Sequence, residues 1–199
     1  ELLFKKLIDD LSEEEVIKFF NDKNIGNSKS IKKYNKKIIH YSHLFFIKWI
    51  SILKNHIDFD KEIKIICEIG GGYGALTEKL LMFHSCKVIM IDLELTNQLS
   101  YYYLKQNFPS LKIQTFNSEN LKKLDYNLFN SVDVIILTPD ILIDEKIKID
   151  LFVNSRSFAE MEYKSIQDYF KLIQNNLRDN GFFLNINRYI KRSVGYNIF

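Results

Sequence analysis

The stretch "ICEIGGGYGALTEKLL", residues 66–81, constrains the fold more than any other part of the chain. It holds four of the seven glycines of the 199-residue sequence, between an apolar run and an amphipathic one. This order predicts a buried strand, a tight turn and a helix. Glycines allow positive φ angles and close approach to a ligand, and the helix that follows offers free N–H groups. The turn is therefore a candidate ligand site.

Strand-like and helical patterns continue to alternate after residue 63. The expected strands are "IKIICEI", "KVIMIDL", "VDVIILT", "IDLFVN" and "GFFLNIN", and a long helix is expected over 158–180. Such alternation predicts an α/β fold, with a Rossmann-like parallel sheet and helices on both faces. "LKIQTF" is also strand-like, and "PDILIDEKIK" is short for a parallel crossover, so the strand count in the middle stays open.

The first sixty residues have a helical pattern. In "LSEEEVIKFF", Ser12 and Glu15 are spaced as a capping box, and residues 41–57 have apolar positions at helical spacing. We therefore expect an N-terminal helical annex or lid over 1–60 and a ligand-binding domain over 61–199.

Composition narrows the class of protein. A hydrophobic content of 46% and a charged content of 27% are typical of a globular domain, and a net charge of +3 gives no argument for nucleic acid. The longest apolar stretch is too short to span a bilayer. The two cysteines have neither disulfide nor metal-site spacing, which fits a reducing compartment. We expect a cytoplasmic protein without a nucleic-acid partner or a membrane span.

Two classes of ligand fit the glycine turn, and the first is a dinucleotide. Gly70, Gly72 and Ala75 satisfy G-x-G-x-x-G/A. Asp92 ends the second expected strand, eighteen residues past Gly74, where a carboxylate accepts hydrogen bonds from ribose hydroxyls. The same residues also fit a purely structural turn and a strand-end acid.

The second class is S-adenosylmethionine (SAM). Glu68, Gly70, Gly72 and Gly74 spell E-x-G-x-G-x-G, which is similar to the first motif of class I SAM-dependent methyltransferases. The extra acid and the third alternate glycine suit a ligand with a cationic amino-acid end and no pyrophosphate. The turn therefore favours SAM over NAD.

Three further blocks carry a resemblance to a family. "IDLELTNQLSYYYL", "LFVNSRSFAEM" and "YFKLIQNNLRDNGFFLNINRYIK" together resemble the sugar O-methyltransferase family of bacteria, over roughly residues 24–192. The resemblance implies a class I methyltransferase sheet and methyl transfer to a hydroxyl of a sugar, sugar nucleotide or glycan precursor. It also implies a role in polysaccharide biosynthesis.

The sequence departs from the family in two places. Glu94-Leu95 stands where the family tends to have Pro-Glu, at the edge of the expected ribose pocket. Only "SVGYNIF" follows Arg192, so either the sequence is a fragment or the last two strands of the usual seven-stranded sheet are missing. Self-association through an uncovered sheet edge or the helical annex would follow.

Methyl transfer to a hydroxyl needs alignment of the oxygen with the methyl group and removal of a proton. Glu160, expected in the first turn of a helix, is the predicted base, although the helix dipole alone favours a carboxylate there. His43 is a second candidate, because its ordinary pKa suits proton removal at neutral pH. The pattern favours the alternative for His43, a helix-terminus or packing histidine.

Polar residues after the later strands complete the predicted site. Asn154 is assigned to the SAM amino group or to helix capping, and Ser157 to substrate or to an N-cap. Arg188 and Tyr189 are assigned to a sugar hydroxyl or a phosphate, with a surface ion pair as the alternative for Arg188. Asp140 would meet the adenine amino group if "VDVIILT" is the third strand.

No metal site is indicated, although Glu160, Asp140 and a substrate diol have donors that suit a divalent cation. The sequence therefore predicts a SAM-dependent O-methyltransferase. The alternatives are an NAD-dependent oxidoreductase, whose Tyr-x-x-x-Lys pair is only loosely present in "YYYLK", and a non-catalytic interaction module of the same fold.

Overall fold

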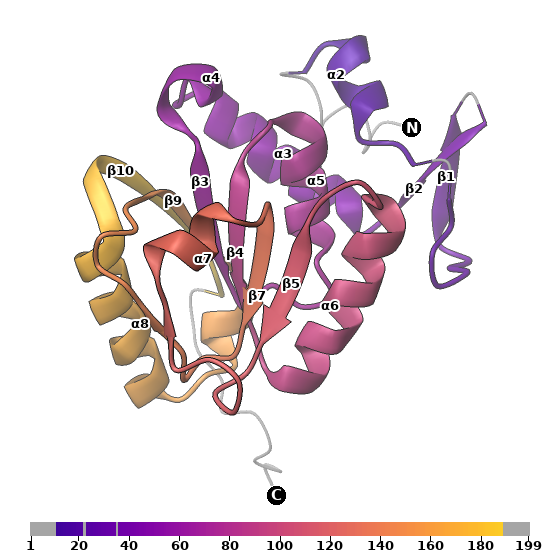
Figure 1. Cartoon of the computed structure of the whole chain (residues 1–199). Coiled ribbons are helices and arrows are strands. Elements are labelled where there is room, and N and C mark those ends of the chain that lie inside the picture. Colours follow the sequence, from indigo (N-terminus) through magenta and orange to yellow (C-terminus); the bar gives the residue numbers. More distant parts are fainter. Residues whose placement is uncertain (1–10, 22, 35, 189–199) are drawn as a thin grey trace, which may run out of the picture.

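The computed structural model describes residues 11–21, 23–34 and 36–188. Its centre is a six-stranded parallel sheet in the order β10-β9-β3-β4-β7-β5 (Figure 1). The strands are β3 (Ile65–Ile69), β4 (Lys87–Ile91), β5 (Ile113–Phe116), β7 (Val134–Leu137), β9 (Ile149–Ser155) and β10 (Leu177–Ile186). The predicted Rossmann-like α/β fold is confirmed.

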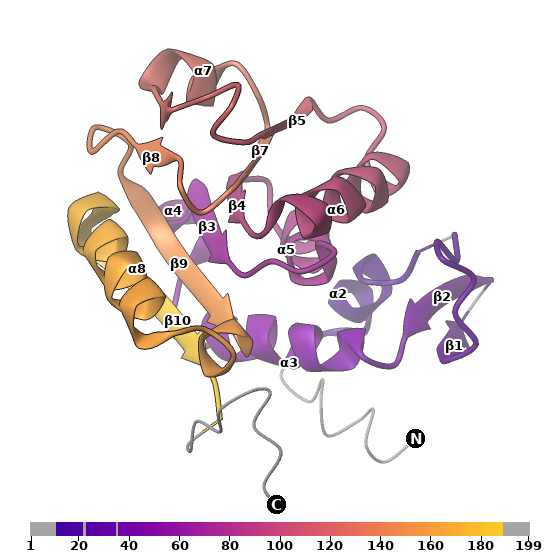
Figure 2. The same cartoon turned by 90° about the horizontal axis from the view of Figure 1, so that it is seen from below.

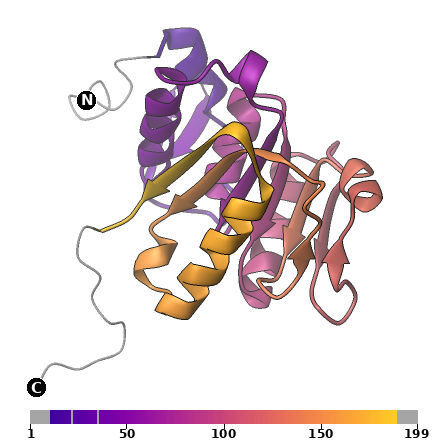
Figure 3. The ribbon, with the colours of Figure 1, turned by 90° about the vertical axis from the view of Figure 1, so that its left-hand side faces the viewer.

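Helices cover both faces of the sheet (Figure 3). Ile66 and Val88 face the layer formed by α3 (His43–Lys54), α5 (Ala75–Phe83) and α6 (Glu94–Asn107). Their neighbours Cys67 and Ile89 face the opposite layer, with α7 (Tyr126–Asn130) and α8 (Tyr163–Asn176). Because successive side chains of a strand point to opposite faces, a strand buried on both sides is apolar throughout.

The order of the strands reverses beside β3. From β3 the chain moves to β4 and β5, returns to insert β7 between them, and then crosses to β9 and β10 on the other side of β3. The loops after β3 and β9 therefore leave neighbouring strands in opposite directions. In open α/β sheets, ligands bind at the carboxyl ends of the strands at such a reversal.

The middle of the sheet resolves what the sequence left open. "LKIQTF" forms the edge strand β5, and the short connection after β7 contains no helix. Instead β8 (Leu142–Ile143) pairs with β6 (Lys123–Leu124) in a separate ribbon. Extended chain advances about 3.3 Å per residue, so residues 138–148 span the length of the sheet and three strand spacings of about 4.8 Å without a helix.

The helix expected over 158–180 is shorter than predicted at both ends. A 3₁₀ turn, η1 (Ser157–Ala159), precedes α8, and β10 begins directly after Asn176. Asn176 is buried and donates from Nδ2 to the carbonyl oxygens of Asp144 (2.9 Å) and Ile147 (3.0 Å). This ties the end of α8 to the connection before β9.

The N-terminal annex is only partly helical. The capping box of Ser12 and Glu15 is present at α2 (Glu13–Lys18), and α4 (Phe59–Glu62) precedes β3. The expectation of helices alone is wrong, because β1 (Ile31–Tyr34) and β2 (Lys37–His40) form an antiparallel hairpin. β-branched Ile38 and Ile39 are buried in it and favour a strand.

The annex and the sheet share one hydrophobic cluster. Phe19 of the annex and Ile47 and Ile50 of α3 pack with Ile66 of β3 and Leu80 of α5. Within the described ranges, no helix combines the length and apolar character needed to cross a membrane. The predicted missing strands would follow Arg192, which lies outside the described residues.

Candidate functional site

The glycine turn lies at the carboxyl end of β3, where the strand order reverses. Gly70, Gly72 and Gly74 have φ angles of 72°, 55° and 93°, and Gly74 caps α5. The turn is closed by a hydrogen bond from the Gly74 N–H to the Gly71 carbonyl oxygen (3.0 Å). Three left-handed residues in five explain the glycines, since other side chains rarely adopt this conformation.

The glycines differ in what surrounds them. A Cβ on Gly70 would lie 2.1 Å from Ser157 Oγ, and one on Gly71 would lie 2.5 Å from Met90 Cε. A Cβ on Gly72 would meet nothing within 4 Å. Gly70 and Gly71 are thus packed against the protein, whereas the backbone at Gly72 faces open space and is accessible to a ligand.

Asp92 lies directly beside Gly72. Its Oδ2 accepts a hydrogen bond from the Gly72 N–H (2.7 Å), and its Oδ1 accepts one from the Leu93 N–H (2.7 Å). A carboxylate oxygen has two lone pairs, so each oxygen retains the capacity to accept from a ligand hydroxyl. The structure therefore brings together Gly72 and Asp92, as the sequence predicts.

Glu68 lies beneath the turn. It is 2% exposed, and Oε2 accepts a hydrogen bond from Thr77 Oγ1 (2.5 Å). Burial raises the pKa of its carboxyl to about 7, the hydrogen bonds with Thr77 lower it, and the Asp92 carboxylate raises it. Glu68 therefore connects the end of β3 to α5 through Thr77, beneath the turn.

A recess of about 200 Å³ opens between the start of α6, which begins two residues after Asp92, and the ends of β5 and β7. Asn97 lines it and donates from Nδ2 to the carbonyl oxygens of Asp92 and Leu137, both at 2.9 Å. Its buried Oδ1 has no hydrogen-bond partner within the described residues. Glu94, Gln98 and Asn117 also line the recess, and this polar lining makes it a candidate site for a ligand with hydrogen-bonding groups.

Asp140 lies on the exposed loop after β7, beyond Thr138 of the same recess. Hydrogen bonds from Ser118 and Thr138 hold the pKa of its carboxyl below the usual value. The strand before Asp140 is not at the sheet edge but beside β4, because β7 is inserted there. This insertion places Asp140 on the Asp92 side of the sheet.

Asn154 and Ser157 connect the end of β9 to the end of β3. Asn154 Nδ2 donates to the Ile69 carbonyl oxygen (2.9 Å) and to Ser157 Oγ, which in turn donates to the same carbonyl (3.2 Å). Asn154 Oδ1 accepts from Asn187 Nδ2 (2.7 Å). With these contacts made, both side chains position the turn in this structure.

The predicted bases occupy different environments. Glu160 is exposed and follows the 3₁₀ turn η1, so its expected place in the first turn of an α-helix is wrong. His43 is 1% exposed, and its Nε2 forms a 2.7 Å hydrogen bond with the hydroxyl of Tyr73 in the glycine turn. Burial, with a contribution from the Lys79 ammonium, lowers the pKa of His43 to about 2.

A buried polar cluster surrounds His43. Glu78, fully buried in α5, accepts from Tyr103 OH (2.8 Å), contacts Lys79 Nζ (2.9 Å) and accepts from Asn21 of the annex. His43 Nδ1 lies 3.6 Å from its Oε2. This separation is longer than a hydrogen bond, and Nδ1 has no hydrogen-bond partner among the described residues.

The remaining predicted contacts are placed as follows. Arg188 is exposed, two residues after β10, and Tyr189 lies outside the described residues. Sequence reasoning missed Tyr73, Glu78 and Asn97. Tyr73 lies within the glycine motif itself and was the available signal, whereas nothing in the sequence shows that Glu78 and Asn97 are buried.

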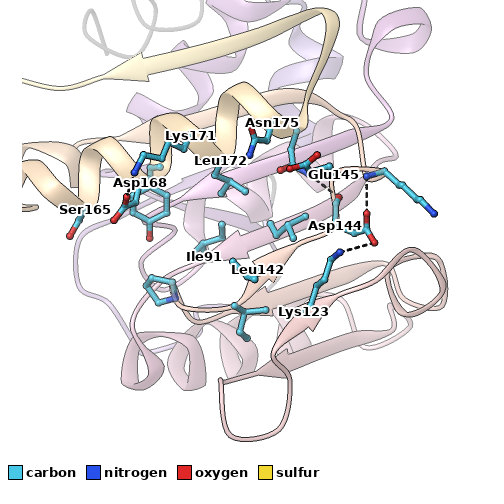
Figure 4. Close-up of a pocket in the computed structure, with 16 residues that line it drawn as sticks. Ile91, Lys123, Leu142, Asp144, Glu145, Ser165, Asp168, Lys171, Leu172 and Asn175 are labelled. Atoms are coloured by element: carbon cyan, nitrogen blue, oxygen red, sulfur yellow. Dashed lines mark hydrogen bonds and ion pairs between the residues drawn. The ribbon is translucent and has the colours of Figure 1, made fainter.

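A larger cavity of about 710 Å³ lies elsewhere, between α8 and residues 139–146 (Figure 4). Leu142 and Leu172 line it, and the ion pairs Lys123–Asp144 (3.2 Å) and Lys171–Asp168 (2.9 Å) lie at it. None of the predicted site residues contributes to its lining.

Across the part of the chain that the structure describes, no group of three or more His, Cys, Asp or Glu side chains is arranged to hold a metal ion.

No model of a known protein family matches the sequence, and no curated protein matches it. Solved structures do resemble the fold. The glycopeptide N-methyltransferase MtfA, complexed with SAM, is 12% identical, with a TM-score of 0.44 over 68% of this chain and 51% of that chain. The mitomycin 7-O-methyltransferase MmcR is 14% identical, with a TM-score of 0.47 over 76% of this chain and 40% of that chain.

The YcgJ protein of Bacillus subtilis is 11% identical, with a TM-score of 0.48 over 71% of this chain and 50% of that chain. The matched region thus spans about half the length of these structures or less. Because the identities are below 25% and the TM-scores below 0.5, these likenesses concern architecture and assign no activity. The resemblance of three sequence blocks to sugar O-methyltransferases is not confirmed by them.

The substitution Gly70→Ala tests the close contact between the turn and Ser157. It should lower the free energy of unfolding by about 2–4 kcal/mol, because it adds a steric clash to left-handed strain. The matched control is Gly26→Ala, which has a φ of 81° and nothing within 4 Å, and should lose only about 1 kcal/mol. Urea denaturation measures both, and equal losses would contradict the assigned contact.

The pKa of Glu68 should appear as a pH dependence of stability. Its folded pKa of about 7 exceeds its ordinary value of 4.5, so the folded state binds more protons between these values. Stability should fall as pH rises through this window, by up to roughly 3 kcal/mol. The glutamine of Glu68→Gln cannot ionise. We therefore expect the free energy of unfolding of the wild type minus that of Glu68→Gln, both from urea denaturation and plotted against pH, to show this fall and to flatten above about pH 8. Parallel curves would show that Glu68 ionises normally.

Proposed function

We propose that this chain is a SAM-dependent methyltransferase that binds its cofactor at the glycine turn. The observation that supports this most is the arrangement of Gly72 and Asp92. The backbone at Gly72 faces open space, and the Asp92 carboxylate lies 2.7 Å from its nitrogen with acceptor capacity left. A nucleoside whose ribose hydroxyls donate to Asp92 would lie against this backbone.

The charges at the turn favour a cationic ligand over a pyrophosphate. Glu68 and Asp92 are both carboxylates, and the charge of Asp92 is close enough to Glu68 to contribute to its raised pKa. A dinucleotide would bring further negative charge to this position, whereas SAM brings an ammonium and a sulfonium. Like charges at short range are unfavourable in a partly buried site.

The adenine would occupy the recess beside Asp92. Asn97 lines this recess, with its unpaired Oδ1 buried, and Asp140 is an exposed acceptor on the adjoining loop. An exocyclic amino group is a donor that matches either residue. In this arrangement Glu68, Gly70, Gly74 and Asn154 shape the turn, and Asp92, Asn97 and Asp140 contact the nucleoside.

The proposed reaction is an in-line displacement at the methyl carbon. An acceptor oxygen attacks the methyl group, the carbon–sulfur bond breaks, and S-adenosylhomocysteine leaves while a base takes the hydroxyl proton. Exposed Glu160 is the proposed base. The alternative base is buried His43, reached through the Tyr73 hydroxyl, but its pKa, lowered to about 2, makes it a weaker base than a carboxylate.

The acceptor is proposed to be a sugar, sugar nucleotide or glycan-precursor hydroxyl, on the strength of the sequence resemblance. Ser157, Arg188 and Tyr189 are the proposed acceptor contacts. The annex over 1–60 would act as a lid on the domain over 61–199. A cytoplasmic role in polysaccharide biosynthesis and self-association through the sheet edge or annex belong to the same proposal.

Calorimetric titration with SAM, S-adenosylhomocysteine and NAD tests the cofactor. We expect micromolar binding of the two adenosyl-sulfur ligands and none of NAD. Asp92→Asn should weaken S-adenosylhomocysteine binding about 10- to 100-fold, because hydrogen bonds to a charged acceptor contribute about 1.5–3 kcal/mol.

Asp125→Asn is the matched control. Asp125 also accepts a backbone N–H, from Leu128 at 2.8 Å, but does so at the start of α7. Its substitution should leave the affinity unchanged. NAD binding, or equal affinities in the wild type and Asp92→Asn, would refute the proposed site.

A further inference from the structure

Arg156, directly after β9, has a left-handed backbone with a φ of 67°. Non-glycine residues rarely adopt this conformation, and strained residues of this kind cluster at functional sites. The surrounding structure holds it in place, because its N–H donates to the Ile186 carbonyl oxygen (2.7 Å). The conformation turns the side chain toward α3 of the annex, which passes beside the end of β9 (Figure 2).

The guanidinium of Arg156 lies over two aromatic rings of α3. Its Cζ is 5.4 Å from the ring centroid of Phe45 and 5.7 Å from that of Trp49. Arg156 is exposed and Phe45 is 45% exposed, whereas Trp49 is 8% exposed. Stacking fixes the plane of the guanidinium and leaves the N–H groups at its edge available.

No ion pair neutralises the charge of Arg156 among the residues that the structure describes. Within the described ranges, no carboxylate lies at ion-pair distance from Arg156, and its recorded contacts are the two rings and its backbone. A fixed planar guanidinium without a carboxylate is suited to a ligand anion, which it can bind through two parallel hydrogen bonds.

Arg156 and Phe45 each lie close in sequence to a residue that is hydrogen-bonded to the glycine turn. Ser157, the next residue after Arg156, donates to Ile69 O at the start of the turn. His43, two residues before Phe45, is hydrogen-bonded to Tyr73 within the turn. Arg156 and Phe45 are therefore adjacent in sequence, or nearly so, to side chains that contact the turn proposed to hold the cofactor.

We infer that Arg156 and Phe45 form an acceptor-binding surface for a sugar that carries an anionic group. The guanidinium edge binds the anion, a phosphate or a carboxylate, and the exposed ring of Phe45 packs against the sugar. This inference rests on the proposed methyltransferase function and narrows its acceptor to anionic sugars. It assigns acceptor binding to Arg156, in addition to the exposed Arg188.

The test is calorimetric titration of the full chain with glucose 1-phosphate, glucuronate and neutral glucose, each in the presence of S-adenosylhomocysteine. At least one anionic sugar should bind with saturation, and glucose should bind at least 10-fold more weakly. A preference between phosphate and carboxylate identifies the anion. Trp49 is the single tryptophan of the chain, so its fluorescence should change along the same titration if the anion binds at Arg156.

Two variants locate the site. Arg156→Gln should weaken binding of the anionic sugar at least 10-fold, since the charged hydrogen bonds are lost. Arg156→Gly should do the same while remaining folded, because glycine accepts a left-handed backbone. Lys36→Gln is the matched control, as Lys36 also has a φ of 67° and a positive charge but lies in the β1–β2 hairpin. It should bind like the wild type.

The outcomes separate this inference from the proposed function. Binding of S-adenosylhomocysteine without saturable binding of either anionic sugar, or with unchanged binding in Arg156→Gln and Arg156→Gly, would overturn the inference alone. In the other case S-adenosylhomocysteine fails to bind, while the wild type binds the anionic sugar and both Arg156 variants do not. That result would overturn the proposed methyltransferase function and leave the anion site.

Discussion

The carbonyl oxygen of Ile69, at the end of β3, accepts hydrogen bonds from Asn154 and Ser157, and the candidate site depends on this contact. It joins two loops that leave neighbouring strands in opposite directions. Ser157 fits there only because Gly70 has no Cβ. Arg156 directly precedes Ser157 and lies over α3. The Ile69 carbonyl therefore helps to position both the turn and the proposed acceptor surface.

A second set of contacts connects the annex to the same turn. Glu78 is buried together with Lys79, and each ion pays a desolvation penalty that their contact and further hydrogen bonds offset. Asn21 and His43 of the annex also surround Glu78. Movement of the annex would therefore disturb Tyr73 through His43. The N-terminal segment is thus physically connected to a site that lies at the end of β3.

The alternation of apolar runs and helical segments was sufficient to predict the parallel sheet, because strands buried on both faces are apolar throughout. Gly70, Gly72, Gly74 and Asp92 were also predictable, since a positive φ and a strand-end acid leave local signatures. The insertion of β7 between β4 and β5 was not predictable. It depends on how the chain returns from β5 over residues 117–133 and on contacts between distant strands, which leave no local pattern in the sequence.

The roles of individual polar residues were harder to foresee. Asn154 lies near the end of β9 and Glu160 follows that strand, yet Asn154 is buried with its hydrogen bonds satisfied and Glu160 is exposed. His43 is a helix-start residue in sequence and a buried residue in the fold. Burial arises from contacts between distant segments, so a local pattern cannot separate a positioning residue from one that meets a ligand.

Hydrogen–deuterium exchange with and without S-adenosylhomocysteine tests the location of the cofactor site most directly. The ligand should slow exchange at the amides of 70–76 and 92–98, and leave residues 142–146 and α8 beside the larger cavity unchanged. Protection confined to 142–146 and α8 would contradict a cofactor site at the glycine turn.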